Sequence, residues 1–165
     1  MTNIAIIGQS AFGENVASEV SKIKDCKIVG IFTPHNHDND PLYQYALKNK
    51  INIYRFKKLR SIKAIEEFNK LEVDLLVMAY VTDIVPMEII NNPTKGTIQY
   101  HPSLLPKHRG PSSINWAIIN GDKSTGITIF WPDEGLDTGP ILMQKEVDIS
   151  PDDTTGSLYF EKLFP

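Results

Sequence analysis

The alternation of short apolar runs with amphipathic segments is the feature that most constrains this chain. Four apolar runs have the pattern of strands, at residues 3–8, 27–33, 51–56 and 74–80. Helical patterns separate them, and the segment Ser61–Lys70 places Ile62, Ile65 and Phe68 on one side of a helix. Strands that alternate with helices predict an α/β fold, doubly wound and Rossmann-like, with a mostly parallel sheet.

The C-terminal third departs from this alternation. The runs 126–131 and 141–149 follow each other without a helix between them, which predicts an antiparallel pair near the C-terminus. A last helix is expected after Asp152, with Leu158, Phe160 and Leu163 as its apolar positions. Because an apolar helical face at a chain end lacks a partner, we expect a domain that is truncated at its C-terminal end.

Length and composition indicate an ordinary globular protein. The 165 residues correspond to one domain by size, and 41% of them are hydrophobic. The formal net charge of -3 does not indicate a nucleic-acid-coating or membrane-surface protein, and no apolar run is long enough for a membrane span. Cys26 is the single cysteine, which excludes an internal disulfide. The start has no basic region before a long apolar run, so we expect a reducing, cytoplasmic location.

Three polar or glycine-containing segments allow ligand sites, but a simpler interpretation is favoured for each. The turn Gly8–Gly13 follows a strand without the Gly-x-Gly-x-x-Gly spacing, which favours a tight turn over a dinucleotide site. The loop 34–41 carries His35, His37, Asp38 and Asp40, which could bind a metal but have the composition of a solvated loop. The basic segment 57–60 indicates an exposed helix start, with contact to an anionic substrate tail as the alternative.

The stretch Gly96–Gly110 contains the residues best suited to chemistry. Pro102 disfavours a helical conformation at His101, so His101 is expected to be the last residue of a strand. Pro106 restricts the loop that follows, and Gly110 permits a tight reversal. Open α/β sheets bind their ligands at the carboxyl ends of strands, which is where this pattern places the imidazole.

Two further residues complete a candidate catalytic group. Gln99 lies two positions before His101, so the two side chains share one face of the strand. Asp137 lies between Gly135 and Gly139 in a second loop. A carboxylate that orients an imidazole and favours its protonated form, beside an amide, suits attack on a carbonyl, because both N–H groups can stabilise the oxyanion.

Other interpretations of these residues stay open. His-Pro at a strand end also occurs as a structural corner, and an aspartate is common in turns. A serine or cysteine nucleophile is not supported, because the chain has no Gly-x-Ser-x-Gly elbow. A metal centre formed by His101, His108 and Asp137 has no known ligand spacing and remains a minor alternative.

The two loops resemble the paired signatures of the folate-dependent formyltransferase family. The first is His101-Pro102-Ser103-Leu104-Leu105-Pro106 with Arg109-Gly110, and the second is Gly135-Leu136-Asp137-Thr138-Gly139. The resemblance extends from Ile4 to the end of the chain, which identifies residues 1–165 as the family's N-terminal catalytic domain. Within the family, the chain resembles most the N-terminal hydrolase domain of 10-formyltetrahydrofolate dehydrogenase, and it is also similar to methionyl-tRNA formyltransferase. The segments that carry this likeness include 6–13, 86–90, 114–116, 121–123 and 129–131.

The resemblance implies roles for individual residues. The family's catalytic histidine and aspartate correspond to His101 and Asp137, and its asparagine corresponds to Gln99, which is a departure. The hydrolase domains also lack that asparagine, so water is a plausible acceptor. The folate ring in the family lies against the backbone of the loop after the central strand, here Asp83, Ile84 and Val85.

The resemblance therefore implies an enzyme that uses 10-formyltetrahydrofolate as formyl donor, without a metal. The formyl group would pass to water or to a small-molecule amine, and nucleic acid would take part only if the acceptor is an aminoacyl-tRNA. The alternatives are a methionyl-tRNA or sugar-nucleotide N-formyltransferase and, in another class, a non-catalytic folate-binding module. No membrane partner is expected.

Overall fold

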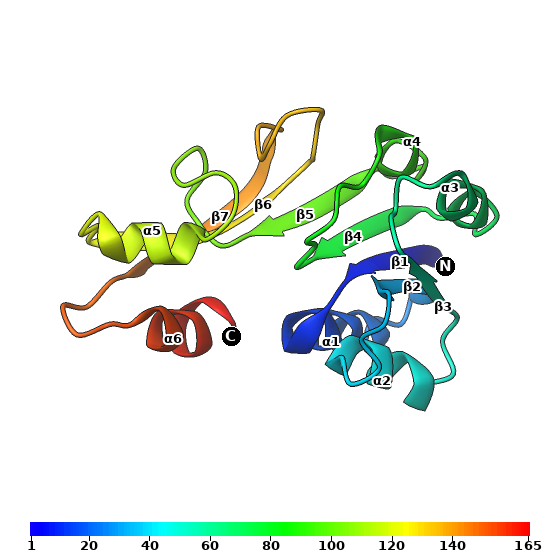
Figure 1. The fold of residues 1–165 in the computed structure, drawn as a ribbon, viewed down its shortest axis with the longest axis horizontal. Helices are drawn as coiled ribbons and strands as arrows, with labels where there is room; N and C mark the ends of the chain where they lie inside the picture. The colour runs from blue at the N-terminus through cyan, green and yellow to red at the C-terminus, as the bar shows by residue number, and fades with distance from the viewer. The chain divides into compact units, whose positions relative to one another are not determined.

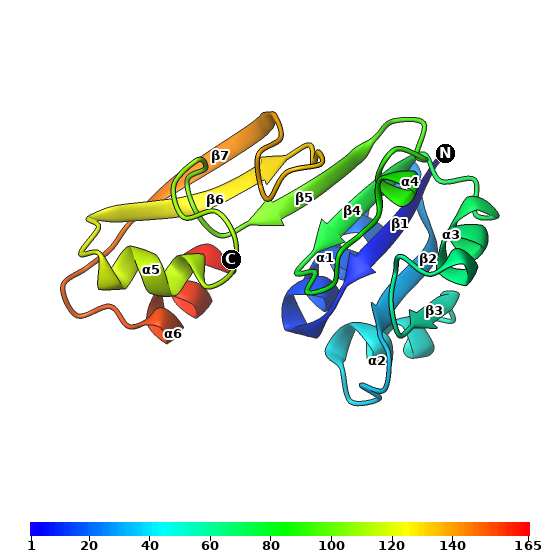
Figure 2. The same ribbon diagram turned by 45° about the horizontal axis from the view of Figure 1, so that its top comes forward.

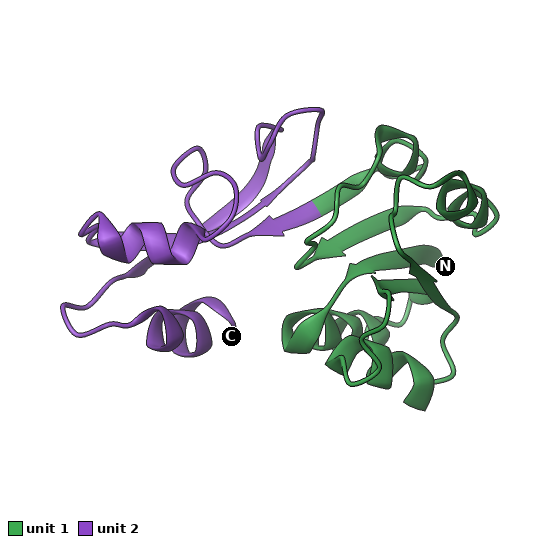
Figure 3. Ribbon diagram, in the orientation of Figure 1, with its two compact units in different colours: residues 1–98 green, residues 99–165 purple.

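The chain folds into two compact units, which Figure 3 shows in different colours. The computed structural model describes residues 1–165, with residues 1–98 in the first unit and 99–165 in the second. The strand that follows Gly96 runs from the first unit into the second. We describe each unit separately.

The first unit contains a parallel sheet in the order β3-β2-β1-β4. Pairing starts at Thr2 opposite Cys26 for β1 and β2, and at Ile4 opposite Leu75 for β1 and β4. The predicted four-strand alternation is therefore confirmed. The strands span β1 (Thr2–Gly8), β2 (Cys26–Pro34), β3 (Ile53–Phe56) and β4 (Leu75–Ala79).

Helices cover both faces of this sheet, as expected of a doubly wound fold. The four helices are α1 (Ser10–Ser21), α2 (Pro41–Lys48), α3 (Ile62–Asn69) and α4 (Met87–Ile90). Figures 1 and 2 show α1 and α2 on one face of the strands, with α3 and α4 on the other. The predicted α/β class is confirmed by this arrangement.

One hydrophobic cluster of the first unit is formed by the strands β1, β2 and β4 and the helices α3 and α4. Phe32, Phe68, Leu76 and Ile89 are fully buried there. The Phe32 ring stacks on Tyr54 with 4.8 Å between the ring centroids. Burial of one such side chain stabilises the fold by about 1.5–3 kcal/mol.

The third strand is shorter than the sequence predicts. The apolar run predicts Ile51 in the strand, but the Ile51 N–H donates to the Ala46 carbonyl over 3.0 Å and closes the turn after α2. Lys50 adopts a positive φ of 55° in that turn. The backbone therefore becomes extended only at Ile53. Apolar composition alone does not separate a helix end from a strand start.

The second unit contains three antiparallel strands in the order β5-β6-β7. Strand β6 pairs with β5 through Gln99 opposite Phe130, and with β7 along its whole length. The predicted antiparallel pair near the C-terminus is confirmed. Figures 1 and 2 show α5 and α6 on the same side of these strands. The elements are β5 (Thr97–His101), α5 (Ser113–Ile119), β6 (Ser124–Phe130), β7 (Ile141–Asp148) and α6 (Thr155–Ser157).

The predicted last helix has two parts. Thr154 caps α6 through a reciprocal pair of bonds with Ser157, and a π-helix follows at Leu158–Leu163. Leu158 and Leu163 are buried, whereas Phe160 is 65% exposed. Two of the three predicted apolar positions are therefore covered, and Phe160 is not. None of the helices is long and apolar enough to cross a membrane.

Candidate active site

Strand β5 ends at His101, as Pro102 predicts. The side chain of His101 is 7% exposed, and both nitrogens of its ring face hydrogen-bond acceptors. Nε2 lies 2.8 Å from the carbonyl oxygen of His108, and Nδ1 lies 3.4 Å from Oδ2 of Asp137. A carbonyl only accepts, so Nε2 carries a hydrogen in this arrangement. Nδ1 is the nitrogen that faces the carboxylate.

Asp137 comes from the loop between β6 and β7. Its side chain is 7% exposed, and its backbone has a left-handed φ of 52°, which aspartate tolerates better than most residues. Oδ2 accepts a 2.7 Å hydrogen bond from the Gly110 N–H. A backbone N–H therefore holds the carboxylate beside the imidazole. The predicted pairing of His101 with Asp137 is present in the second unit.

Gln99 lies beside the same carboxylate. Its Nε2 donates to Asp137 Oδ1 across 3.5 Å, at the long limit of a hydrogen bond. Gln99 and His101 thus lie on one face of β5, and each contacts a different oxygen of Asp137. One hydrogen of the amide points to Asp137, and the second is left for another acceptor.

The loop after His101 is held by hydrogen bonds to β6 and β7. Thr128 Oγ1 donates to the Ser103 carbonyl over 2.6 Å and accepts from the Leu105 N–H over 3.1 Å. Gln144 on β7 donates to the Leu105 carbonyl and to Thr128 Oγ1, both over 2.9 Å. Because Thr128 and Ser103 are fully buried, the two hydrogen bonds between Thr128 and the loop backbone are shielded from water. Hydrogen bonds to Thr128 and Gln144 therefore restrain this loop in addition to its prolines.

The glycines beside Asp137 allow close packing within the loop and against the end of β6. A Cβ on Gly139 would overlap the Trp131 carbonyl oxygen, and one on Gly135 would overlap the Thr138 side chain. The Thr138 hydroxyl donates to Asp133 over 2.6 Å, and this bond holds the pKa of Asp133 below its ordinary value. The close approach that these glycines permit is therefore made by the chain's own atoms.

The predicted folate-binding segment lies in the first unit, after β4. The Asp83 carboxylate accepts from the Leu59 N–H over 2.8 Å and from the Ile84 N–H over 2.9 Å, and lies 3.8 Å from Lys58 Nζ. Asp83 lines a cavity of about 520 Å³ at the carboxyl ends of the parallel strands. This volume is in the range of small-molecule sites. Ile84 is 66% exposed, whereas Val85 is buried.

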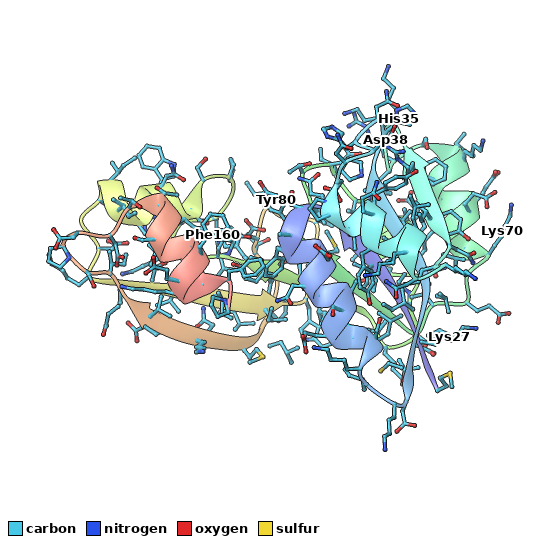
Figure 4. The ribbon with its side chains drawn as sticks, turned by 90° about the horizontal axis from the view of Figure 1, so that it is seen from below. Lys27, His35, Asp38, Lys70, Tyr80 and Phe160 are labelled. Atoms are coloured by element: carbon cyan, nitrogen blue, oxygen red, sulfur yellow. The ribbon has the colours of Figure 1, made fainter.

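The polar side chains of loop 34–41 do not form a cluster of metal ligands. Asp40 caps α2 by accepting from the N–H groups of Leu42 and Tyr43, and Asp38 pairs with Arg55 over 2.6 Å. His35 is exposed, is labelled near Asp38 in Figure 4, and lines the cavity that Asp83 also lines. The structure contains no group of three or more His, Cys, Asp or Glu side chains arranged to hold a metal ion.

His108 and Asp122 lie near the pair of His101 and Asp137, and the sequence does not predict their contact. The sequence allows His108 only as a ligand of a metal shared with His101 and Asp137. Its ring instead bonds Asp122, with 2.6 Å between Nε2 and Oδ2, and its carbonyl accepts from His101. The separation of 14 residues between His108 and Asp122 has no regular period, so no sequence signal joins them.

Comparisons with known proteins identify relatives along the whole chain. Residues 2–163 match the formyl transferase family. Mouse cytosolic 10-formyltetrahydrofolate dehydrogenase is 45% identical over 98% of this chain, and the mouse mitochondrial form is 44% identical over the same share. Methionyl-tRNA formyltransferase of Acetivibrio thermocellus is 43% identical over 72% of the chain and 38% of its own length. The chain spans only 19% and 18% of the length of the two dehydrogenases.

Solved structures with the same fold include two enzymes with formyl chemistry in their names. Phosphoribosylglycinamide formyltransferase from Bacillus halodurans superimposes with a TM-score of 0.85 at 24% identity, over 97% of this chain and 87% of that one. A formyltetrahydrofolate deformylase from Pseudomonas syringae has a TM-score of 0.78 at 23% identity, over 95% and 54%. At these identities, the likeness establishes the fold.

Proposed function

This chain belongs to the formyl transferase family, and on that premise we propose that it binds 10-formyltetrahydrofolate and transfers the formyl group to water or to an amine. The observation that carries the proposal is the convergence of His101, Gln99 and Asp137 in the second unit. His101 and Asp137 belong to the two segments whose sequences resemble the family signatures, and Gln99 lies on β5 two residues before the first of them. The family match across residues 2–163 supports one catalytic domain over residues 1–165.

His101 is the proposed general acid. Its Nε2 is held by the His108 carbonyl at 2.8 Å, whereas Nδ1 has a looser contact of 3.4 Å with Asp137. A substrate oxygen can therefore compete for the Nδ1 hydrogen without disturbing the bond that orients the ring. In the proposed reaction, the Nδ1–H of an imidazolium polarises the formyl C=O and later passes its proton to N10 of the leaving tetrahydrofolate.

Asp137 is the proposed base. It takes a proton from the attacking water or amine as the new C–O or C–N bond forms at the formyl carbon. The C–N10 bond then breaks, and N10 receives its proton from His101. With water the products are formate and tetrahydrofolate, and proton return from Asp137 to His101 resets the pair. Gln99 donates its second amide hydrogen to the oxyanion.

The donor site is proposed to include Asp83, Ile84 and Val85. The cavity of about 520 Å³ that Asp83 lines supports a ligand at this end of the first unit. The Asp83 carboxylate already accepts two backbone hydrogen bonds, so its role is to shape the loop for the folate. No metal takes part in the proposed reaction.

We also propose a reducing, cytoplasmic location for this protein. Its single cysteine fits such a compartment, and the relatives include a cytosolic and a mitochondrial enzyme. Fractionation of cells that express the full-length protein tests this location.

The reaction is tested by incubating the full-length protein that contains this chain with 10-formyltetrahydrofolate. Release of tetrahydrofolate and formate without an acceptor supports the hydrolase reaction. Turnover that requires an added amine supports a transferase, and methionyl-tRNA and amino-sugar nucleotides are the acceptors to compare. Binding of the folate without turnover under any of these conditions would contradict the proposed activity and identify a folate-binding module.

A further inference from the structure

The loop Lys107–Gly110 contacts both members of the catalytic pair through its backbone. The His108 carbonyl accepts from His101 Nε2 over 2.8 Å, and the Gly110 N–H donates to Asp137 Oδ2 over 2.7 Å. Only one residue separates these two backbone groups. Any shift of this loop therefore moves the hydrogen-bond partners of the acid and of the base together.

The conformation of His108 is one that the chain must hold in place. Its φ of 51° lies in the left-handed region, which residues other than glycine rarely occupy, although histidine is found there more often than most. This conformation places the carbonyl toward His101 while the ring points to another partner. A side-chain anchor opposes relaxation of such a backbone.

Asp122 provides that anchor. Its Oδ2 lies 2.6 Å from His108 Nε2, and the two side chains are 22% and 14% exposed. The Asp122 N–H donates to the Ala117 carbonyl over 3.0 Å, which holds the backbone of Asp122 against the last turn of α5. The short distance and low exposure distinguish this contact from ordinary surface ion pairs, which contribute little.

We propose that His108 and Asp122 form a positioning pair for His101. In the reaction proposed above, on which this inference rests, the pair fixes the His108 carbonyl, and the carbonyl fixes the ring so that Nε2 carries a hydrogen and Nδ1 faces the reacting atoms. In many histidine enzymes a carboxylate orients the ring directly. Here the His108 carbonyl orients the His101 ring at Nε2. The Asp122 carboxylate acts indirectly, because it holds the His108 side chain and thereby the loop that carries this carbonyl.

Paired substitutions test this role in the full-length protein. His108→Asn removes the imidazole but keeps a residue that tolerates a left-handed backbone. Asp122→Ala removes the acceptor, and Asp122→Asn retains an acceptor oxygen for the ring. We expect kcat to fall on the order of 10-fold to 10²-fold in His108→Asn and Asp122→Ala, because a small misplacement of a catalytic group has effects of this size. KM for the folate should change little, and Asp122→Asn should recover most of the rate.

The double variant adds a test of coupling. If His108 and Asp122 act as one unit, His108→Asn with Asp122→Ala loses no more activity than either single variant. Losses that multiply would contradict the pair. The Asp153→Asn variant is a matched control, because it alters a different short contact of an aspartate in the second unit, with Lys162 at 2.5 Å, and leaves the loop 107–110 alone.

A spectroscopic measurement separates positioning from catalysis. Proton–nitrogen correlation NMR is recorded on protein whose histidine rings are labelled with nitrogen-15. The signal that disappears in His101→Gln belongs to His101, and it should show a hydrogen on Nε2. We expect this signal to shift or broaden in His108→Asn and Asp122→Ala but not in Asp153→Asn. An unchanged His101 signal and an unchanged kcat per folded molecule in both pair variants would overturn the inference. The measurement needs no turnover, so it remains decisive even if the wild-type protein fails the formyl-transfer assay.

Discussion

Two loops of this molecule each follow a strand and adjoin or contain histidines, but these histidines have different surroundings. In loop 34–41, Asp40 caps a helix, Asp38 pairs with Arg55, and the rings of His35 and His37 are exposed. At the end of β5, directly before the second loop, His101 is buried, with Nε2 hydrogen-bonded to the His108 carbonyl and Nδ1 3.4 Å from the Asp137 carboxylate. Both loops follow a strand, so position at a strand end does not distinguish them. Burial and converging hydrogen bonds do, because they fix a side chain in the one orientation that chemistry needs.

The largest expected effect is on the buried histidine and its carboxylate. His101→Ala and Asp137→Ala should each lower the rate of tetrahydrofolate release by at least on the order of 10²–10³, since each removes a charge-stabilising or proton-transferring group. His37→Ala is the matched control from the exposed loop and should retain the wild-type rate, because His37 does not line the cavity beside Asp83. A comparable loss in His37→Ala, or normal turnover without His101, would reverse the comparison between the loops.

A smaller effect is expected at Gln99, whose amide contacts Asp137 only at 3.5 Å. Gln99→Leu removes the proposed oxyanion donor and should lower kcat on the order of 10-fold, below the loss for a well-placed donor. Gln99→Asn shortens the side chain to the length that the family pattern has. We expect this variant to raise transfer to an amine relative to hydrolysis, measured as the ratio of formylated product to formate. An unchanged ratio would exclude Gln99 as the residue that selects the acceptor.

In the exposed loop, the expected effects concern local stability. Asp40→Ala removes the N-cap of α2 together with a 2.7 Å hydrogen bond from the Ser10 N–H. Loss of such a cap costs about 1 kcal/mol. Amide hydrogen exchange in α2 should accelerate accordingly while turnover stays normal. A loss of turnover at unchanged exchange would indicate that this loop takes part in the reaction.

The smallest effect is expected at Asp153, a carboxylate that neither loop uses. Hydrogen bonds from Lys162, the Ser150 N–H and Ser157 lower the pKa of Asp153 from 3.8 to about 2. A carboxyl whose pKa is lowered by folding stabilises the folded state above its unfolded pKa, so this contribution is complete near neutral pH. It should disappear as the pH falls from about 4 to about 2. Hydrogen exchange of residues 153–163 measures it, and Asp153→Asn should remove the pH dependence in that range.

Much of the fold could be predicted because its signals are local. Apolar periodicity located the parallel strands, and the run after Gly139 was correctly paired with β6. Pro102 placed His101 at the end of β5. Boundaries were less predictable, as at Ile51, because the hydrogen bond that assigns this residue to a turn depends on where α2 ends. The π-helix at Leu158–Leu163 has no sequence signal of its own.

The sequence by itself determined the fold class and the candidates His101, Gln99 and Asp137, because strand periodicity, a following proline and paired loop motifs are properties of neighbouring residues. Only the tertiary structure decided how these candidates are held. It directed the His108 carbonyl to His101, the Gly110 N–H to Asp137 and the His108 ring to Asp122. These hydrogen bonds join residues 7 to 27 positions apart, and they depend on the path of the backbone through space, which no periodic pattern in the sequence records.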